Sequence, residues 1–420
     1  MFPCSPRLPL HYHADSQHTV DDDNRDGIGE YSDVRTSLLV PRLRPFTSTI
    51  FAEMTALATQ TGAVNLGQGF PDTDGPASML ATAQDAIAAG VNQYPPAAGR
   101  PELRRAIATH RARYGTAYDP DTQVLVTVGA TEAIAATLLA LVEARDEVLL
   151  IEPYYDSYAA AVAMSGATRR VVSLVEDGDR FALDIDALRA AVTRRTKVVL
   201  INSPHNPTGM VLTGQELRGI AELCQEHDLI AVTDEVYEHL VFDGHEHVSL
   251  ASLPGMAERT LAISSAGKTF NSTGWKIGWV CGPAELVGAV RSAKQFLTFV
   301  GGAPFQPAVA HALDNELPWV DALCAGLQRK RDRLTAGLAT AGFGVRPTQG
   351  TYFVCADVRP LGFDDGAELC RRLPEWIGVA AVPVQVFTDS PERWRHLIRF
   401  AFCKRDEVID EAIARLGKLG

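Results

Sequence analysis

Short apolar runs rich in β-branched residues recur along most of the chain. Seven of these runs predict strands, at residues 123–129, 147–153, 169–175, 196–204, 229–237, 260–268 and 275–283. Most are continuous rather than alternating, which is typical of strands buried on both faces of a sheet. Helical patterns, such as residues 131–144 and 213–227, lie between many of them. The alternation predicts an α/β fold with a mainly parallel, seven-stranded sheet wrapped by helices.

Two departures from this regular pattern refine the prediction. Only six residues separate the last two predicted strands, too few for a helical crossover, so one strand there should be antiparallel. After about residue 310 the sequence becomes rich in helical patterns with a few strands, which predicts a smaller α+β domain at 311–420. Residues 1–40 are polar and without period, and we expect a disordered N-terminal extension there.

The amino-acid composition limits the kinds of molecule that this protein is expected to bind. The 39 basic and 51 acidic residues of the 420-residue chain give a formal net charge of −12. Without a basic block, neither nucleic acid nor an anionic membrane is an expected partner, and no apolar run approaches the roughly 18 residues that cross a bilayer. The 7 cysteines show no close pairing, so we expect reduced thiols, a cytoplasmic protein and no metal site.

Polar side chains follow the predicted strands at their carboxyl ends, where ligands bind in such sheets. Strand 123–129 leads into Ala130 and Thr131 at the start of a helix, which is an anion site because free amides point outward there. The next strand ends near Tyr155. The strands after it deliver Asn206, then Asp234 and Tyr237, and finally Ser265 and Lys268 in the stretch "SSAGKTFNSTGWKIGW". Each residue alone could be structural, but together they predict a ligand site.

Lys268 could grip a nucleotide phosphate or act as a nucleophile toward a carbonyl compound. The stretch "AGKT" lacks the first glycine of a phosphate-binding P-loop, because residue 262 is alanine. The stretch "LGQGFPD" has two glycines of a dinucleotide-binding fingerprint but not the third. Both nucleotide-binding motifs, the P-loop and the dinucleotide-binding fingerprint, are therefore excluded.

Five stretches together resemble the class I, fold-type-I, pyridoxal-5′-phosphate (PLP)-dependent aminotransferases: "SSAGKTFNSTGWKIGW", "NSPHNPTG", "TDEVYEHL", "VNLGQGFPD" and "NQYPPAAGRPELRRAIA". Within them the chain is similar to the branch of kynurenine, methionine and glutamine aminotransferases. In details such as "FVGGAPFQPAVA" it looks most like bacterial N-succinyldiaminopimelate aminotransferases. The resemblance covers about residues 41–418 and implies a segment at 41–80 that joins the small domain, and a large PLP-binding domain at 81–310.

The resemblance also implies roles for individual residues. Lys268 matches the Schiff-base lysine that moves the substrate proton, Asp234 the partner of the pyridine nitrogen, and Tyr237 a catalytic hydrogen-bond partner of the ring oxygen. The other implied cofactor contacts are Asn206 to the ring oxygen, Tyr155 stacked on the ring, and Ala130, Thr131, Ser265, Lys276 and a second subunit's Tyr94 around the phosphate. The implied substrate contacts are Gly69, Asn206, Phe51 and Arg399, the last as a clamp for the α-carboxylate, unless Arg399 is a salt-bridged structural residue.

The implied activity is a ping-pong transamination by a homodimer, in which an L-amino acid passes its amino group to a 2-oxo acid such as 2-oxoglutarate. The expected donor is N-succinyl-L,L-2,6-diaminopimelate, an intermediate of lysine biosynthesis. The alternatives are a broader kynurenine, methionine or glutamine aminotransferase and a cysteine-S-conjugate β-lyase. A PLP-sensing regulator would need a DNA-binding domain that residues 1–39 do not resemble, and an inactive binding protein would be expected to lack a catalytic position.

Overall fold

The seven predicted strands all form one central sheet in the computed structural model, which describes residues 38–46 and 49–419. The strands are β2 (Val124–Val128), β3 (Glu147–Glu152), β4 (Thr168–Ser173), β7 (Thr196–Asn202), β8 (Ile230–Asp234), β9 (Thr260–Ser265) and β10 (Ile277–Cys281). They are ordered β2-β10-β9-β8-β7-β3-β4. Only β10 is antiparallel to its neighbours, β2 and β9, and the other pairs are parallel. This confirms the predicted α/β class and the antiparallel strand.

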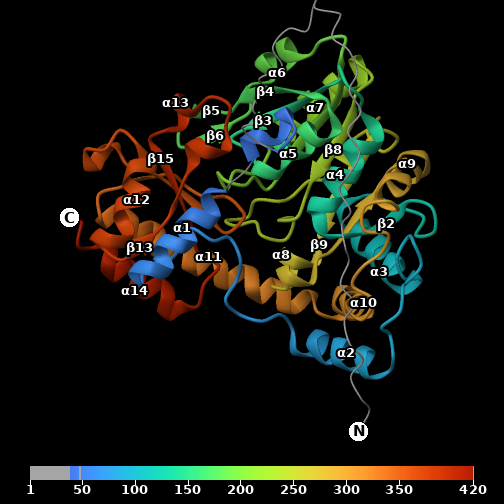
Figure 1. The fold of residues 1–420 in the computed structure, drawn as a ribbon, viewed down its shortest axis with the longest axis horizontal. Helices are drawn as coiled ribbons and strands as arrows, with labels where there is room; N and C mark the ends of the chain where they lie inside the picture. Colours follow the sequence, from blue (N-terminus) through green and yellow to red (C-terminus); the bar gives the residue numbers. More distant parts are fainter. Residues whose placement is uncertain (1–37, 47–48, 420) are drawn as a thin grey trace, which may run out of the picture. The chain divides into compact units, whose positions relative to one another are not determined.

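Helices cover both faces of this sheet (Figure 1). One face packs against α4 (Gly129–Leu141), α5 (Asp156–Ser165) and α9 (Ala284–Lys294). The opposite face packs against α6 (Ile185–Ala191) and α7 (Gly214–Glu226) near β3 and β7. Near β2 and β10 the same face is covered by α2 (Ala77–Ala88), α3 (Pro101–Arg111) and α10 (Phe305–Asn315). Successive residues of β3 alternate between the two cores, with Val148 in one and Leu149 in the other, so the strand is apolar throughout.

A second sheet forms from the C-terminal part of the chain, in the order β11-β12-β15-β14. Its strands are β11 (Gly344–Val345), β12 (Phe353–Asp357), β14 (Val382–Pro383) and β15 (Leu397–Ala401), all paired antiparallel. It packs with α11 (Leu317–Thr340), α12 (Gly366–Trp376) and α14 (Asp406–Leu416), and α13 (Pro391–Trp394) lies beside β15 in sequence. In Figure 1, α11 runs from beside α10 toward these red elements. A hairpin of β5 (Val175–Asp177) and β6 (Arg180–Ala182) forms a separate two-stranded sheet, and its Phe181 packs in the same core as Leu149 of β3.

The segment after residue 49 joins this C-terminal part. Helix α1 (Ile50–Thr61) contacts α12, and β1 (Val64–Asn65) pairs in parallel with β13 (Val379–Ala380). Residues 41–420 form one compact unit. The domain boundaries at 80/81 and 310/311 stay a prediction, and the expected disorder of residues 1–40 falls almost wholly on residues 1–37, outside the described part of the chain.

Strands β8 and β9 each end three residues earlier than the apolar pattern indicated, and in both cases a side chain predicted to be catalytic lies just beyond the strand. Strand β9 stops at Ser265 and a single helical turn, α8 (Ala266–Thr269), carries Lys268. Strand β8 stops at Asp234, and Tyr237 lies in the turn after it. The pattern missed both ends because the turns are buried and apolar like the strands, with Ala266 and Val236 packed inside.

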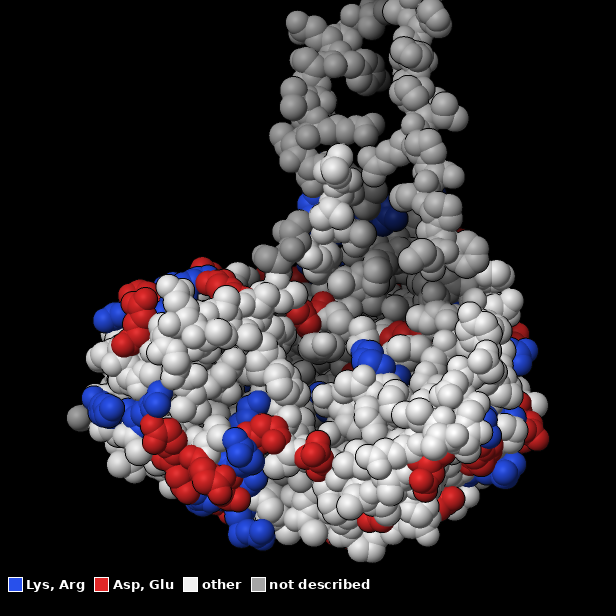
Figure 2. Space-filling view, turned by 60° about the horizontal axis from the view of Figure 1, so that its bottom comes forward, with Lys and Arg blue, Asp and Glu red and all other residues white. Residues whose placement is uncertain are grey.

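Among the described residues, no helix combines the length and apolar character that a membrane crossing requires. The face drawn in Figure 2 is hollowed near its middle, and acidic and basic side chains are interspersed on it.

Candidate active site

A cavity of about 340 Å³ opens at the carboxyl ends of the parallel strands, where the sequence placed the ligand site. Of the thirteen residues predicted to bind cofactor or substrate, twelve line it: Phe51, Gly69, Ala130, Thr131, Tyr155, Asn206, Asp234, Tyr237, Ser265, Lys268, Lys276 and Arg399. The thirteenth, Tyr94, is not among the lining residues and is 81% exposed. A volume of this size suits a small molecule.

Lys268 projects into the cavity from the helical turn after β9. Its Nζ donates a hydrogen bond of 3.3 Å to the carbonyl oxygen of Gly69. Burial lowers the pKa of Lys268 to about 8, against a partly opposing attraction from Asp234. A lysine with such a pKa is neutral in an appreciable fraction of molecules near pH 7, and the neutral amine is the form that attacks carbonyls and accepts protons.

Asp234 lies at the end of β8 with 4% of its surface exposed. Tyr158 donates a hydrogen bond of 2.5 Å to Asp234 Oδ2, and the backbone N–H of Val236 donates one of 3.2 Å to Oδ1. Burial raises the pKa of Asp234 to about 6, although the hydrogen bond from Tyr158 acts in the opposite direction. The carboxylate is therefore mostly ionised at neutral pH and suited to hold a protonated ring nitrogen.

Arg399 is buried on β15, with 1% of its surface exposed. Its Nη1 donates to Asn206 Oδ1 at 2.8 Å and its Nη2 to the Gly67 carbonyl at 3.1 Å, while Nε has no partner within the described part of the chain. No acidic side chain among the described residues forms an ion pair with it. The salt-bridged structural alternative is therefore not supported. A buried guanidinium without a carboxylate partner is costly unless an anion binds beside it.

The opposite end of the cavity is built for a phosphate-sized anion. Helix α4 begins at Gly129, so its first backbone N–H groups, those of Ala130 and Thr131 among them, point out of the helix end. Lys276 adopts a left-handed backbone with φ of 55°, and its Nζ lies 3.1 Å from the place where a Cβ on Gly129 would stand. A Cβ on Gly278 would lie 2.5 Å from the Gly129 carbonyl carbon. Both glycines thus let the lysine and the helix end approach each other.

Aromatic side chains form the walls. Tyr155 is half-buried, and its ring stands edge-on to that of Tyr158 at 5.8 Å. Phe51 comes from α1 and packs on Phe387, and its ring centroid lies 5.3 Å from the Arg399 guanidinium carbon. The elements that meet here therefore include the large sheet, the C-terminal sheet and the segment after residue 49.

The comparisons with known proteins place this geometry in a family. Residues 61–416 match the family model of class I and II aminotransferases. The chain belongs to this family. A protein of Mycobacterium tuberculosis described as a "probable N-succinyldiaminopimelate aminotransferase" is 62% identical over 91% of this chain and 98% of its own length. The methionine aminotransferase of Escherichia coli is 38% identical over 91% of this chain and 99% of its own length. The solved structure of N-succinyldiaminopimelate aminotransferase from M. tuberculosis superposes with a TM-score of 0.90 at 64% identity, covering 91% of this chain and all of that one.

This aminotransferase moves amino groups between amino acids and 2-oxo acids, with pyridoxal 5′-phosphate as its cofactor. When bound, PLP accepts the electrons released at the substrate Cα. The residues of the cavity fit the group, because a nucleophilic lysine, a buried carboxylate, an aromatic wall and an anion-binding helix end surround one space.

Sequence reasoning missed several residues of the aminotransferase site. Tyr158 holds Asp234, and Asn202 links two predicted residues, since its Nδ2 donates to the Asp234 carbonyl at 2.8 Å and its Oδ1 accepts from Asn206 N at 2.7 Å. Gln68 and Phe353 also line the cavity. The spacing of Tyr155 and Tyr158, three apart at the start of a helix, is the one signal that could have placed Tyr158 on the same side.

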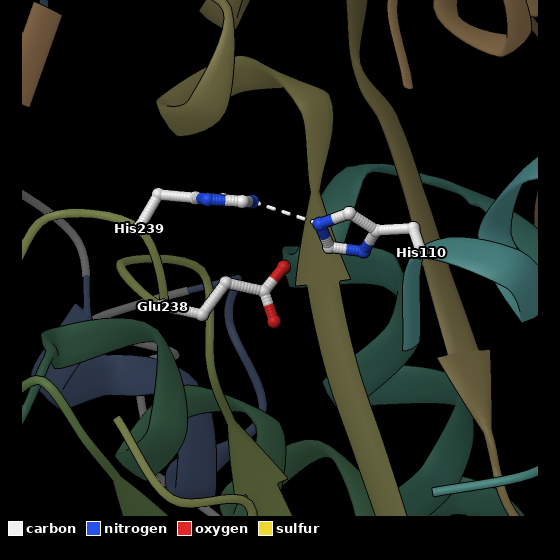
Figure 3. Close-up of side chains that lie close together, drawn as sticks. All are labelled: His110, Glu238 and His239. Carbon is white, nitrogen blue, oxygen red and sulfur yellow. Dashed lines mark hydrogen bonds between the residues drawn. The ribbon is translucent and has the colours of Figure 1, made fainter. Parts of the chain in front are cut away.

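A buried polar cluster lies beside the turn that carries Tyr237, and Figure 3 shows three of its members, His110, Glu238 and His239. Arg111 forms ion pairs with Glu235 and Glu238, and the Nε2 atoms of His110 and His239 are hydrogen-bonded at 2.8 Å. Although a ring nitrogen of each histidine and a Glu238 oxygen lie within 4.8 Å of one another, the two Nε2 atoms already bond each other, and Glu238 accepts from Arg111 and Ser264. These contacts occupy the ligand atoms that a metal would need, so we interpret the cluster as a structural support.

Replacing Lys268 with methionine is expected to stabilise the cofactor-free aminotransferase at pH 7 by about 2–3 kcal/mol, because the folded state there holds a buried charge. The folded-state pKa of about 8 lies below the unfolded value of 10.5, so the penalty is complete below pH 8 and disappears as the pH rises toward 10.5. Urea unfolding should therefore show a large gain at pH 7 and a much smaller one at pH 10. Lys197→Met, at a largely exposed lysine, is the control and should change little. A Lys268 variant less stable than the parent at pH 7 would contradict the desolvation argument.

Proposed function

We propose that this enzyme transfers the α-amino group of N-succinyl-L,L-2,6-diaminopimelate to 2-oxoglutarate by a ping-pong mechanism, as a step of lysine biosynthesis. The observation that carries the general chemistry is Arg399, a buried guanidinium with no carboxylate partner among the described residues, in the same cavity as the low-pKa Lys268. The choice of donor is supported by 62% identity over most of both chains to a relative described by that substrate.

In this proposal the Arg399 guanidinium binds the α-carboxylate of each substrate and points its Cα toward Lys268. The neutral Lys268 amine takes the Cα proton, and Asp234, held by Tyr158, stabilises positive charge on the ring nitrogen. Asn206 and Tyr237 hold the ring oxygen, Tyr155 covers the ring, and Ser265, Lys276 and the start of α4 bind the phosphate. Gly69 and Phe51 border the substrate.

A donor panel tests the substrate. N-succinyl-L,L-diaminopimelate, L-methionine, L-kynurenine and L-glutamine are each assayed with 2-oxoglutarate, and glutamate formation is measured. The proposal expects kcat/KM at least about tenfold higher for the first donor. Preference for methionine, kynurenine or glutamine would instead assign the broader activity. Pyruvate and ammonia formed from a cysteine S-conjugate without an oxo acid would indicate a β-lyase.

The same panel tests the clamp through Arg399→Lys. An ammonium cannot make two parallel bonds to a carboxylate, so kcat/KM should fall about ten- to hundredfold for every donor, equivalent to about 1.5–3 kcal/mol. Arg331→Lys is the matched control, because Arg331 is also buried but is paired with Asp243 and Asp332. It should lower the melting temperature and leave KM unchanged. If Arg399→Lys instead lowered the melting temperature and left KM unchanged, Arg399 would be a structural residue.

We also propose a homodimer in which Tyr94 of each subunit completes the phosphate site of the other. An exposed apolar patch supports this: the ring of Tyr94 packs edge-on against Phe299 at 5.5 Å, and Phe296 nearby in sequence is 85% exposed. Sedimentation at assay concentration should give a dimer, and Tyr94→Phe should weaken PLP retention. A fully active monomer would refute the proposal.

A cytoplasmic location is part of the proposal as well. The six cysteines in the described part of the chain are all free thiols, which is typical of a reducing compartment.

A further inference from the structure

The carbonyl oxygen of Gly69, a residue that lines the cavity, accepts two hydrogen bonds. One comes from Lys268 Nζ at 3.3 Å, and the other comes from the hydroxyl of Tyr352 at 2.6 Å. Tyr352 lies 283 residues from Gly69 in sequence and is buried, with 1% of its surface exposed. The shorter bond, from Tyr352, joins two uncharged groups, so binding of a charged ligand does not change the charge of either group. This bond therefore holds in place the carbonyl that orients Lys268.

The backbone around Tyr352 is held in an unusual conformation. Thr351 is fully buried and has φ of 67°, in the left-handed region that β-branched residues rarely adopt. It persists because hydrogen bonds fix it from both sides: Thr351 N donates to the Leu240 carbonyl at 2.8 Å, and Thr351 Oγ1 accepts from Phe353 N at 3.1 Å. Such strain tends to occur where a functional side chain must be placed. Here it directs Tyr352 toward Gly69.

The ring of Tyr352 also encloses the lysine. Its centroid lies 5.5 Å from Lys268 Nζ and 5.2 Å from the centroid of the Tyr237 ring, which it meets edge-on. Burial raises the pKa of Tyr352 well above its ordinary value, so the phenol keeps its proton and remains a donor.

The segment that contains Gly69 is fixed to the C-terminal part of the chain by further donors. Arg399 Nη2 donates to the Gly67 carbonyl, and Lys404 Nζ donates to the Phe70 carbonyl at 2.7 Å. A side chain on Gly69 could not be accommodated, because its Cβ would lie 2.6 Å from Phe353. These contacts hold the segment in place around the Gly69 carbonyl, and Tyr352 is the donor that fixes this carbonyl itself.

We propose that Tyr352 is a positioning residue for proton transfer: it holds the Gly69 carbonyl, and this carbonyl in turn keeps the Lys268 amine directed at the substrate Cα. The inference rests on the role proposed for Lys268 as the base. Without the Tyr352 hydroxyl, the carbonyl and the amine gain freedom, and removal of the Cα proton should become slower while binding of the α-carboxylate by Arg399 is unaffected.

The test is Tyr352→Phe in the PLP-loaded enzyme, which removes the hydroxyl and keeps the ring. The expected result is a kcat lowered about five- to tenfold, the worth of one hydrogen bond, with KM within about twofold of the parent. With a donor deuterated at Cα, the kinetic isotope effect on kcat should increase, because proton transfer becomes more strongly rate-limiting. A purely structural role would not change this isotope effect.

Tyr154→Phe is the matched control. Tyr154 is also buried, and its hydroxyl makes a bond of the same length, 2.6 Å, to Asp389. This variant should lose stability without a change in the isotope effect. An unchanged kcat and isotope effect in Tyr352→Phe would overturn the inference, as would an equal change in both variants. Failure of the role proposed for Lys268 is distinguishable, because a Lys268→Ala variant would then keep its activity.

Discussion

Three charged side chains that share one buried cavity set the main constraint on this structure. Lys268, Asp234 and Arg399 are each removed from bulk water. Burial raises the pKa of Asp234 and lowers the pKa of Lys268 and Arg399, so in each case it favours the neutral form. No two of them form an ion pair among the described contacts. Such an arrangement costs stability in the free protein, and it becomes favourable when an anion and a ring cation neutralise the charges. The fold therefore maintains a site whose electrostatics are completed by its ligands.

The three charged residues are positioned by two different sheets. Asp234 ends β8 and Lys268 lies just after β9, and because these two strands are parallel neighbours in the large sheet, the sheet fixes the spacing of the two residues. Arg399 lies on the antiparallel C-terminal sheet, and the segment from Gly67 to Phe70 connects it to the lysine, because Arg399 donates to the Gly67 carbonyl and Lys268 to the Gly69 carbonyl. If the C-terminal sheet shifted relative to the large sheet, the contacts of Lys268 with Gly69 and of Arg399 with Gly67 would both change. Several side-chain donors hold the segment and oppose such a shift.

Much of the fold and most of the site followed from the sequence, because both depend on local signals. Continuous apolar runs located all seven strands, and polar residues at or just after their carboxyl ends located Asn206, Asp234 and Ser265 at the cavity. The contacts that escaped prediction join distant segments: Tyr158 reaches Asp234 across 76 residues, and Tyr352 reaches Gly69 across 283. No periodicity in a single chain encodes such pairings. The proposed contact of Tyr94 with a second subunit likewise involves another chain, so no pattern within this sequence encodes it.

The proposed mechanism requires that Lys268 is the amine that bonds PLP. Borohydride treatment of the yellow holoenzyme, followed by proteolysis and mass spectrometry, measures which residue retains the cofactor. The account predicts loss of the yellow absorbance and one modified peptide, containing Lys268. Recovery of the cofactor on any other lysine, Lys276 included, would contradict it.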